Sequence, residues 1–340
     1  MNTDEQYMRR CIALARSAEG LTYPNPMVGC VIVCDGHIIG EGYHRRAGKG
    51  HAEVNAIASV ANKELLHRST LYVSLEPCAH YGKTPPCSKL IIEMGIPRVV
   101  VGCVDSFSAV SGKGIQMLRE AGIEVHVGLL ENECSALNRR FFMFHEKHRP
   151  YIILKWAQSA DGFIGQPERA VWLTNDACKR LVHKQRTTEQ AILVGANTAI
   201  NDNPSLTPRL WHGNQPTRIV IDPHLHTTEN LNLLSDGIKT IILNAEKSEQ
   251  IGNVKYIQTP FNDNLNGILT ALYNEGLQSV IVEGGTRTLQ PFIDNNLWDE
   301  AYVYKSPLVL GSGIAAPNFA HSALRTDIID GVTLEYHKRE

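Results

Sequence analysis

The sequence predicts an α/β protein built from two domains. Short apolar runs rich in β-branched residues alternate with amphipathic segments, which is the pattern of strands separated by helices. A length of 340 residues exceeds what one hydrophobic core usually organises. A charged helical stretch ends at Pro150, where proline interrupts the helical pattern. We therefore expect one domain over residues 1–147 and a second over residues 148–340.

The first domain is predicted to begin with a helix, because residues 4–18 repeat apolar side chains at helical spacing. The turn residues Asp35-Gly36 join two strand-like runs, 28–33 and 38–40, into a hairpin. A further helix begins near His51. The remaining expected elements are strands over 70–75, 98–104 and 123–127, and helices over 87–94, 112–121 and 128–148.

The second domain is predicted to be another α/β series. Residues 201–216 are rich in Asn, Pro and Gly and predict a long loop, and loops of that length are often functional. The absence of Gly-x-Gly-x-x-Gly argues against a Rossmann dinucleotide site. Residues 280–289 instead combine a strand, a glycine pair and a helix start, which suits a phosphate but is also common without a ligand. The expected strands are 151–156, 191–195, 218–222, 240–243, 279–282 and 301–304.

Composition excludes several classes of function. The formal net charge of −2 provides no attraction for a nucleic-acid backbone. No stretch approaches the roughly 20 apolar residues of a membrane helix. The acidic, polar residues 1–6 do not resemble a signal peptide. We expect a cytoplasmic protein with reduced cysteines and with neither a nucleic-acid nor a membrane partner.

One histidine and two cysteines carry the chemistry of the first domain. His51 stands at an expected helix start, Cys78 follows a strand, and Cys87 follows a proline pair that suits another helix start. An imidazole and two thiolates leave the fourth position of tetrahedral zinc to water, as in catalytic zinc sites. Helical residues two apart point in different directions, so Glu53 would miss the metal yet reach that water and move its proton.

The spacing of the two cysteines is unusual. Zinc nucleobase deaminases commonly have two residues between them, whereas eight residues separate Cys78 from Cys87 here. A core histidine beside two unrelated cysteines is the alternative interpretation. His44 and His80 stay open, because each could be a ligand, a substrate contact or an ordinary polar loop residue. The cysteines expected to act as buried apolar residues or to lie in helical patterns are Cys11, Cys30, Cys34, Cys103, Cys134 and Cys178.

Residues 1–145 resemble the deaminase domain of the bifunctional riboflavin-biosynthesis deaminase/reductase family. The resembling segments, with the wide cysteine spacing typical of that family, are 24–29, 42–44, 50–53 and 76–87. The resemblance implies a cytidine-deaminase-like α/β/α sandwich, Zn²⁺ held by His51, Cys78 and Cys87, and proton transfer by Glu53. It also implies that Asn25 contacts the pyrimidine base and that Lys83 and Thr84 lie near the ribose-phosphate. The family usually has Asp-Pro-Asn-Pro where this chain reads Asp105-Ser106-Phe107-Ser108.

Residues 150–310 resemble the reductase domain of the same family, which implies a dihydrofolate-reductase-like α/β fold that uses NADPH. The resembling segments are 154–155, 159–162, 172–174, 195–198, 202–207 with Arg209, 218–222 and 283–285. The implied nucleotide contacts are Ala157, Trp172, Thr198, Asp202, Gly285, Thr286, Arg287, Thr288, Leu289, Gln290 and Pro291. The implied substrate contacts are Arg186, Leu206, Arg209 and Glu283, with Lys155 beside the reacting ribose as the first candidate proton donor. A serine is common where this chain has Ala170.

Structural interpretations stay open for four of these residues. Lys155 could extend along an apolar strand, and Arg186 could complement a helix dipole. Trp172 could belong to the core, and Asp202 could form a turn. The ordered series of motifs favours the functional interpretation.

The resemblance implies a bifunctional enzyme of riboflavin biosynthesis. The first domain would deaminate 2,5-diamino-6-(5-phosphoribosylamino)pyrimidin-4(3H)-one to 5-amino-6-(5-phosphoribosylamino)uracil, and the second would reduce the ribosyl group to ribityl with NADPH. The expected partners are this phosphorylated pyrimidine and further copies of the chain in a homo-oligomer. Two alternatives remain: a nucleic-acid or nucleoside deaminase, which should show a basic stripe, and a zinc-stabilised binding module, in which Glu53 would be dispensable.

Overall fold

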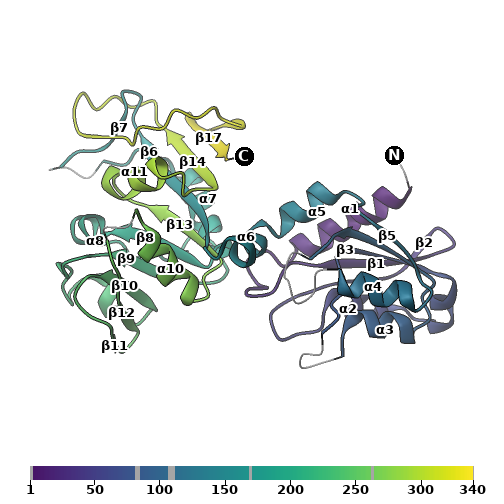
Figure 1. The fold of residues 1–340 in the computed structure, drawn as a ribbon. Coiled ribbons are helices and arrows are strands. Elements are labelled where there is room, and N and C mark those ends of the chain that lie inside the picture. The colour runs from purple at the N-terminus through teal and green to yellow at the C-terminus, as the bar shows by residue number, and fades with distance from the viewer. Residues whose placement is uncertain (1–2, 81–84, 106–111, 168–170, 262–263, 340) are drawn as a thin grey trace. The chain divides into compact units, whose positions relative to one another are not determined.

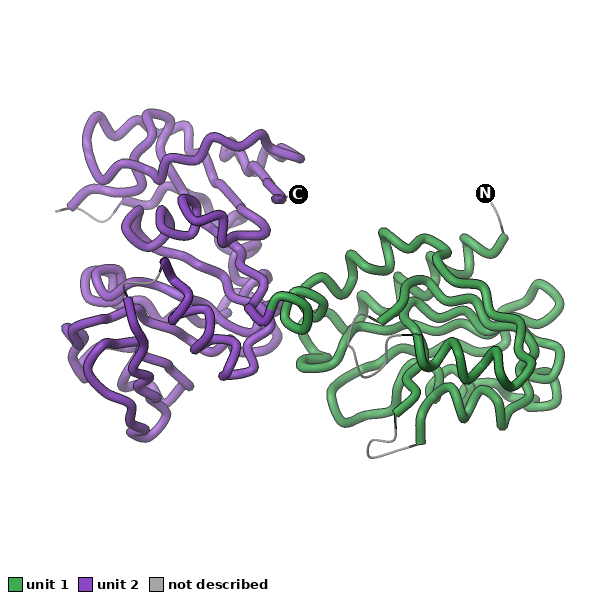
Figure 2. The backbone as a smooth tube through the Cα atoms, viewed as in Figure 1, with its two compact units in different colours: residues 1–147 green, residues 148–340 purple. Residues whose placement is uncertain are grey.

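The computed structural model describes residues 3–80, 85–105, 112–167, 171–261 and 264–339. The chain forms two compact units, Met1–Lys147 and His148–Glu340 (Figure 2). Within the described part of the chain, no helix is long and apolar enough to cross a membrane.

The first unit is built on a five-stranded sheet in the order β2-β1-β3-β4-β5 (Figure 1). The strand β1 (Gly29–Cys34) runs antiparallel to β2 (His37–Tyr43) and to β3 (Thr70–Leu75). Parallel to β3 follow β4 (Arg98–Cys103) and β5 (Glu124–Val127). These are the strands that the sequence predicts, with small differences at their ends.

Helices cover both faces of this sheet, as Figure 1 shows. On one face lie α1 (Thr3–Arg16) and α5 (Glu131–Leu137). On the other lie α2 (Ala52–Ser59), α3 (Cys87–Glu93) and α4 (Lys113–Glu120). Successive strand residues point to opposite faces, so buried Val31 packs with the α1 layer and buried Ile32 with the α2 layer. The expected α/β/α sandwich is confirmed.

The stretch 128–148, predicted as one helical segment, divides into α5 and α6 (Arg139–Lys147). The two helices separate at buried Asn138, whose backbone leaves helical geometry with φ −111° and ψ 19°. The Met27 N–H donates to Asn138 Oδ1 at 2.7 Å, and Asn138 Nδ2 donates to the Met27 carbonyl at 2.9 Å. The break in the helix therefore braces the segment that carries Asn25. A 3-10 helix, Lys63–Arg68, was also not predicted.

The second unit is built on a ten-stranded sheet in the order β11-β12-β10-β9-β8-β13-β6-β14-β17-β16. All six predicted strands are confirmed: 191–195 has the predicted bounds, and the other five differ by one or two residues at their ends. The parallel strands are β6 (Tyr151–Gln158), β8 (Ala191–Gly195), β9 (Thr217–Ile221), β10 (Thr240–Asn244), β12 (Val254–Gln258), β13 (Ser279–Glu283) and β14 (Glu300–Lys305). Antiparallel strands at the edges are β11 (Glu249–Ile251), β16 (Arg325–Ile329) and β17 (Val332–Lys338), and a separate pair is β7 (Phe163–Gly165) with β15 (Ile314–Ala315).

The order of strands reverses where β13 lies between β6 and β8. In open α/β sheets such a switch point opens a crevice beyond the carboxyl ends of the strands, where ligands bind. In the register of β6 with β13, Lys155 lies beside Glu283, and β8 ends at Gly195. The helices of this unit are α7 (Asp176–Thr188), α8 (Ala196–Asp202), α9 (Asn232–Ser235), α10 (Asn266–Asn274) and α11 (Thr286–Asp294).

Candidate active sites

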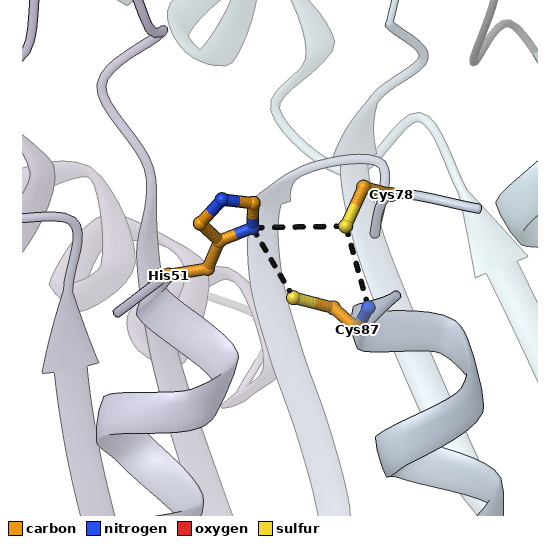
Figure 3. A group of neighbouring side chains, drawn as sticks. All are labelled: His51, Cys78 and Cys87. Atoms are coloured by element: carbon orange, nitrogen blue, oxygen red, sulfur yellow. Dashed lines mark hydrogen bonds between the residues drawn. The ribbon is translucent and has the colours of Figure 1, made fainter. Parts of the chain in front are cut away.

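The three predicted metal ligands of the first unit come together. His51 Nδ1 lies 3.6 Å from Cys78 Sγ and 3.4 Å from Cys87 Sγ (Figure 3). Tetrahedral zinc, with bonds of about 2.0 Å to nitrogen and about 2.3 Å to sulfur, requires its nitrogen and sulfur ligands to be about 3.5 Å apart. The group therefore fits zinc in both its geometry and its donor atoms.

Local structure explains why these side chains meet. His51 directly precedes α2 in an extended conformation, and Cys87 is the first residue of α3 after Pro86. The Cys87 N–H donates to Cys78 Sγ at 3.3 Å. Ser88 donates to the Cys78 carbonyl from its backbone N–H at 3.2 Å and from its hydroxyl at 3.0 Å. The start of α3 thus positions both cysteines.

The two thiols influence each other's pKa. Interaction with Cys87, and then with His51, outweighs burial and lowers the pKa of Cys78. Cys78 and burial together raise the pKa of Cys87 well above its ordinary value. A bound cation favours the thiolate form of both ligands.

Glu53 lies on α2 with only 3% of its surface exposed, and it is not part of the group of three ligands. Burial raises the pKa of Glu53 to about 7, with a further contribution from Cys78 that His51 opposes. A carboxyl group with this pKa can both take up and release a proton near neutral pH.

Asn25 is held by His44. Asn25 Nδ2 lies 3.1 Å from His44 Nε2, and His44 Nδ1 lies 3.1 Å from the Gly50 carbonyl. A neutral imidazole that donates to Gly50 and accepts from Asn25 satisfies both contacts. Buried His44 is thus a partner of the predicted base contact and, like exposed His80, lies outside the metal group found among the described residues.

Glu76 is a buried residue whose role the sequence did not reveal. Its carboxylate accepts hydrogen bonds from four backbone N–H groups: those of Asp105, Gly112, Gly114 and Ile115, at 2.9–3.3 Å. It therefore fixes the start of α4 against the end of β3, two residues before Cys78. The predicted contacts Lys83 and Thr84, the family departure at Ser106-Phe107-Ser108, and Ala170 lie outside the described residues.

The candidate site of the second unit contains a cluster of charges. Glu283 Oε2 lies 3.7 Å from Lys155 Nζ and 3.1 Å from Arg186 Nη2. Burial alone would raise the pKa of Glu283, but Arg186 and Lys155 outweigh it, so the pKa is below its ordinary value. Arg186 is 9% exposed, and its Nε has no hydrogen-bond partner among the residues that the structure describes. The cluster is net cationic and retains a free donor, which suits an anionic ligand.

The loop that carries Leu206 and Arg209 is fixed at several points. Leu206 is buried and has a positive φ of 54°. The Leu210 N–H donates to His183 Nδ1 at 3.2 Å, and Arg186 donates to the Thr207 carbonyl at 3.4 Å. The cluster of Arg186, Arg209, Lys155 and Glu283 acts electrostatically on His183, whose pKa burial lowers to about 4. His183 was missed, although its position one helical turn before Arg186 could have indicated it.

Buried Arg218 anchors the same loop. Its side chain is fully buried and forms two hydrogen bonds of 2.6 Å with Asp236. It also donates to the Ser205 carbonyl at 3.2 Å, next to Leu206. The backbone around the predicted substrate contacts is therefore anchored to a buried ion pair.

Two helix starts form a cradle at the switch point. The helices α8 and α11 begin after Gly195 and Gly285, and neither has a side-chain cap. A Cβ on Gly195 would lie 2.5 Å from Thr288 Oγ1, and a Cβ on Gly284, where φ is +130°, would lie 3.2 Å from Thr198 Oγ1. The structure thus brings together the predicted contacts Thr198, Gly285 and Thr288, with uncapped N–H groups that suit a pyrophosphate such as that of NADPH.

The other predicted nucleotide contacts lie in varied surroundings. Trp172 is 70% exposed with Lys179 Nζ 4.3 Å from its ring centre, so the core interpretation is wrong. Leu289 is fully buried, so its side chain belongs to the core. Asp202 is the last residue of α8. Ala157, on β6, and Gln290 and Pro291, on α11, are half-buried, whereas Arg287 is exposed and Thr286 donates to the Ala315 carbonyl.

The fold and the sites define the class of protein: a zinc-dependent deaminase domain joined to an NADPH-dependent reductase domain. Residues 1–103 match the cytidine and deoxycytidylate deaminase zinc-binding region, and residues 150–336 match the RibD C-terminal domain. These matches exclude the alternative of a zinc-stabilised binding module.

Known proteins resemble the whole chain. It is 40% identical to the riboflavin biosynthesis protein RibD of Aquifex aeolicus over 92% of this chain and 89% of the relative. It is 36% identical to RibD of Escherichia coli, over 91% of this chain and 89% of that relative. A solved structure from Thermotoga maritima, a diaminohydroxyphosphoribosylaminopyrimidine deaminase/5-amino-6-(5-phosphoribosylamino)uracil reductase, matches with a TM-score of 0.90 and 34% identity, covering 99% and 98% of the two chains. The chain belongs to the RibD family and is a bifunctional deaminase/reductase of riboflavin biosynthesis.

Proposed function

We propose that this chain deaminates a diaminopyrimidine carrying phosphoribosylamine and then reduces the ribosyl group to ribityl with NADPH. The observation that carries the proposal is the group of His51, Cys78 and Cys87 beside buried Glu53. The Thermotoga maritima protein, whose name gives this pair of activities, supports the choice of substrate. We assign the deaminase domain to residues 1–147 and the reductase domain to residues 148–340, the ranges of the two compact units.

In the proposed deamination, the metal supplies Lewis acidity when bound, which lets water act as a nucleophile near neutral pH. Glu53 takes a proton from that water as the oxygen of the water adds to the amine-bearing carbon. Glu53 then delivers the proton to the departing amine, and ammonia leaves. Asn25, oriented by its contact with His44, holds the pyrimidine so that this carbon faces the ligand group.

In the proposed reduction, NADPH supplies a hydride to the carbonyl carbon of the opened ribosyl chain. Lys155 donates the proton that neutralises the developing alkoxide. Glu283 holds the side chains of Lys155 and Arg186 together, and Arg186 and Arg209 bind the phosphate. The cradle formed by the starts of α8 and α11 receives the nucleotide pyrophosphate.

The decisive experiment follows ammonia and NADPH separately with the diaminopyrimidine substrate. Because Glu53 moves the proton but does not bind the metal, Glu53→Gln should keep stoichiometric zinc and lose ammonia release by at least about 100-fold. NADPH oxidation on the already deaminated compound should be unchanged in this variant. Loss of zinc, or full activity, would contradict the assigned role. The homo-oligomer and the cytoplasmic location stay predictions, which light scattering and fractionation would test.

A further inference from the structure

The loop between His44 and His51 carries an unusual concentration of positive charge. Arg45, Arg46 and Lys49 are all exposed, and no acidic residue occurs between Glu41 and Glu53. None of these three cations forms an ion pair with any residue that the structure describes, and the guanidinium of Arg45 lies 5.6 Å from the ring centre of Tyr43. We call these three side chains the cationic rim.

Both ends of this loop lie at the deaminase site. The His44 ring packs edge-on against the ring of His51, with 5.5 Å between centroids. Asn55 Nδ2 donates to the Tyr43 carbonyl at 2.8 Å and to the Gly50 carbonyl at 3.0 Å, so the ends of the loop are held together. The cationic rim therefore lies on a short loop whose two ends are held together beside the metal ligand His51.

A tight turn brings the backbones of Arg46 and Lys49 close together. The Lys49 N–H donates to the Arg46 carbonyl at 3.1 Å, and Gly48 between them has a φ of +79°. A positive φ at this position is typical of a type II turn, whose end residues lie within about 7 Å of each other. Like charges carried on one tight turn repel each other when their side chains approach, and an anion shared between them offsets that repulsion.

We propose that the cationic rim binds the phosphate monoester of the deaminase substrate. This inference rests on the proposed function, which places the base against Asn25 and the metal group. The phosphate at the other end of such a substrate carries close to two negative charges at neutral pH. Arginine donates to phosphate oxygens in pairs, and lysine adds a mobile point charge. The rim thus selects phosphorylated pyrimidines over their nucleoside-like counterparts.

The test compares two compounds on charge-removal variants. Arg46→Gln, Lys49→Gln and the double variant are assayed for ammonia release from the phosphorylated diaminopyrimidine and from the same compound without phosphate. The control is Arg68→Gln, which removes an exposed positive charge before β3, at the opposite end of the strand from Cys78. Zinc content and reductase activity report whether each variant is folded.

For the double variant we expect KM for the phosphorylated compound to rise about 10-fold at low salt, with kcat retained. The difference should shrink as salt rises, because screening weakens exposed charges. KM for the unphosphorylated compound, and both KM values of the Arg68→Gln control, should not change. An unchanged KM for the phosphorylated compound overturns the inference, as does an equal loss on both compounds. If the unaltered protein releases no ammonia from the phosphorylated compound, the proposed function itself fails.

Discussion

Replacing Glu76 with glutamine should destabilise the deaminase unit selectively. The substitution keeps the size of the side chain but turns one carboxylate oxygen into an amide that faces backbone donors. Each oxygen of Glu76 accepts two N–H groups, so two hydrogen bonds to a charged acceptor are lost. At about 1.5–3 kcal/mol for each such bond, the free energy of unfolding should fall by about 3 kcal/mol or more.

The chain offers separate probes for its two units. All four tryptophans lie after residue 150, so tryptophan fluorescence reports on the second unit, whereas zinc release into a chromogenic chelator reports on the first. With a urea m-value of about 2 kcal/mol/M, the zinc-release midpoint of Glu76→Gln should fall by about 1.5 M. The fluorescence midpoint should stay in place.

The matched control is Glu120→Gln, because Glu120 is an exposed residue of α4 that pairs only with Gln116 in the described structure. Its midpoint should move by less than about 0.3 M. A shift of that size for Glu76→Gln would refute the reasoning, since it would mean that the four N–H groups do not depend on the carboxylate. Equal shifts of both probes would refute the selectivity.

Three further predictions concern other parts of the chain. Asp202→Ala should raise KM for NADPH about 10-fold and leave ammonia release unchanged; loss of both activities would contradict independent sites. His183→Asn keeps an acceptor for the Leu210 N–H and should preserve the KM of the reductase for its phosphorylated substrate, whereas His183→Gln should raise this KM about 5-fold. Equal KM values for the two variants would disprove the anchoring role. The hydrogen bond from Arg98 holds the pKa of Asp4 below its ordinary value, so this stabilisation is present at neutral pH and is lost as pH falls through that lowered pKa. Calorimetry should therefore show Asp4→Asn less stable than the unaltered protein at pH 7, with a stability difference that shrinks as the pH is lowered below the ordinary pKa of aspartate. A difference that stays constant over this range would exclude the ion pair with Arg98 as its cause.

The sequence could predict the metal group because each ligand stands next to a local signal. A proline pair before Cys87, a strand before Cys78 and a helix start at His51 are all visible within a few residues. The buried strands of the first unit were predictable for the same reason, since both faces of its sheet are covered and the runs are continuously apolar.

The roles of Glu76 and Asn138 could not be predicted, because their partners are distant in the chain. Glu76 accepts from Gly112, and Asn138 bonds Met27, through backbone groups that carry no sequence signal. The antiparallel strands β16 and β17 were missed because many of their residues are exposed or half-buried, which weakens the apolar pattern.

The position of β13 in the second sheet has a consequence for how the chain folds during synthesis. Tyr151 opens β6, but its neighbour in the sheet is Ser279, and the other side of β6 waits for β14. The strand β8, which is made next in this sheet, does not pair with β6. It pairs with β13, which lies between β6 and β8. Contacts between residues so distant in the sequence form slowly, and the apolar strands stay exposed until their partners have been synthesised. The sheet of the second unit is thus completed only when β13 and β14 have been made, whereas the described strands of the first sheet have all been synthesised by residue 127.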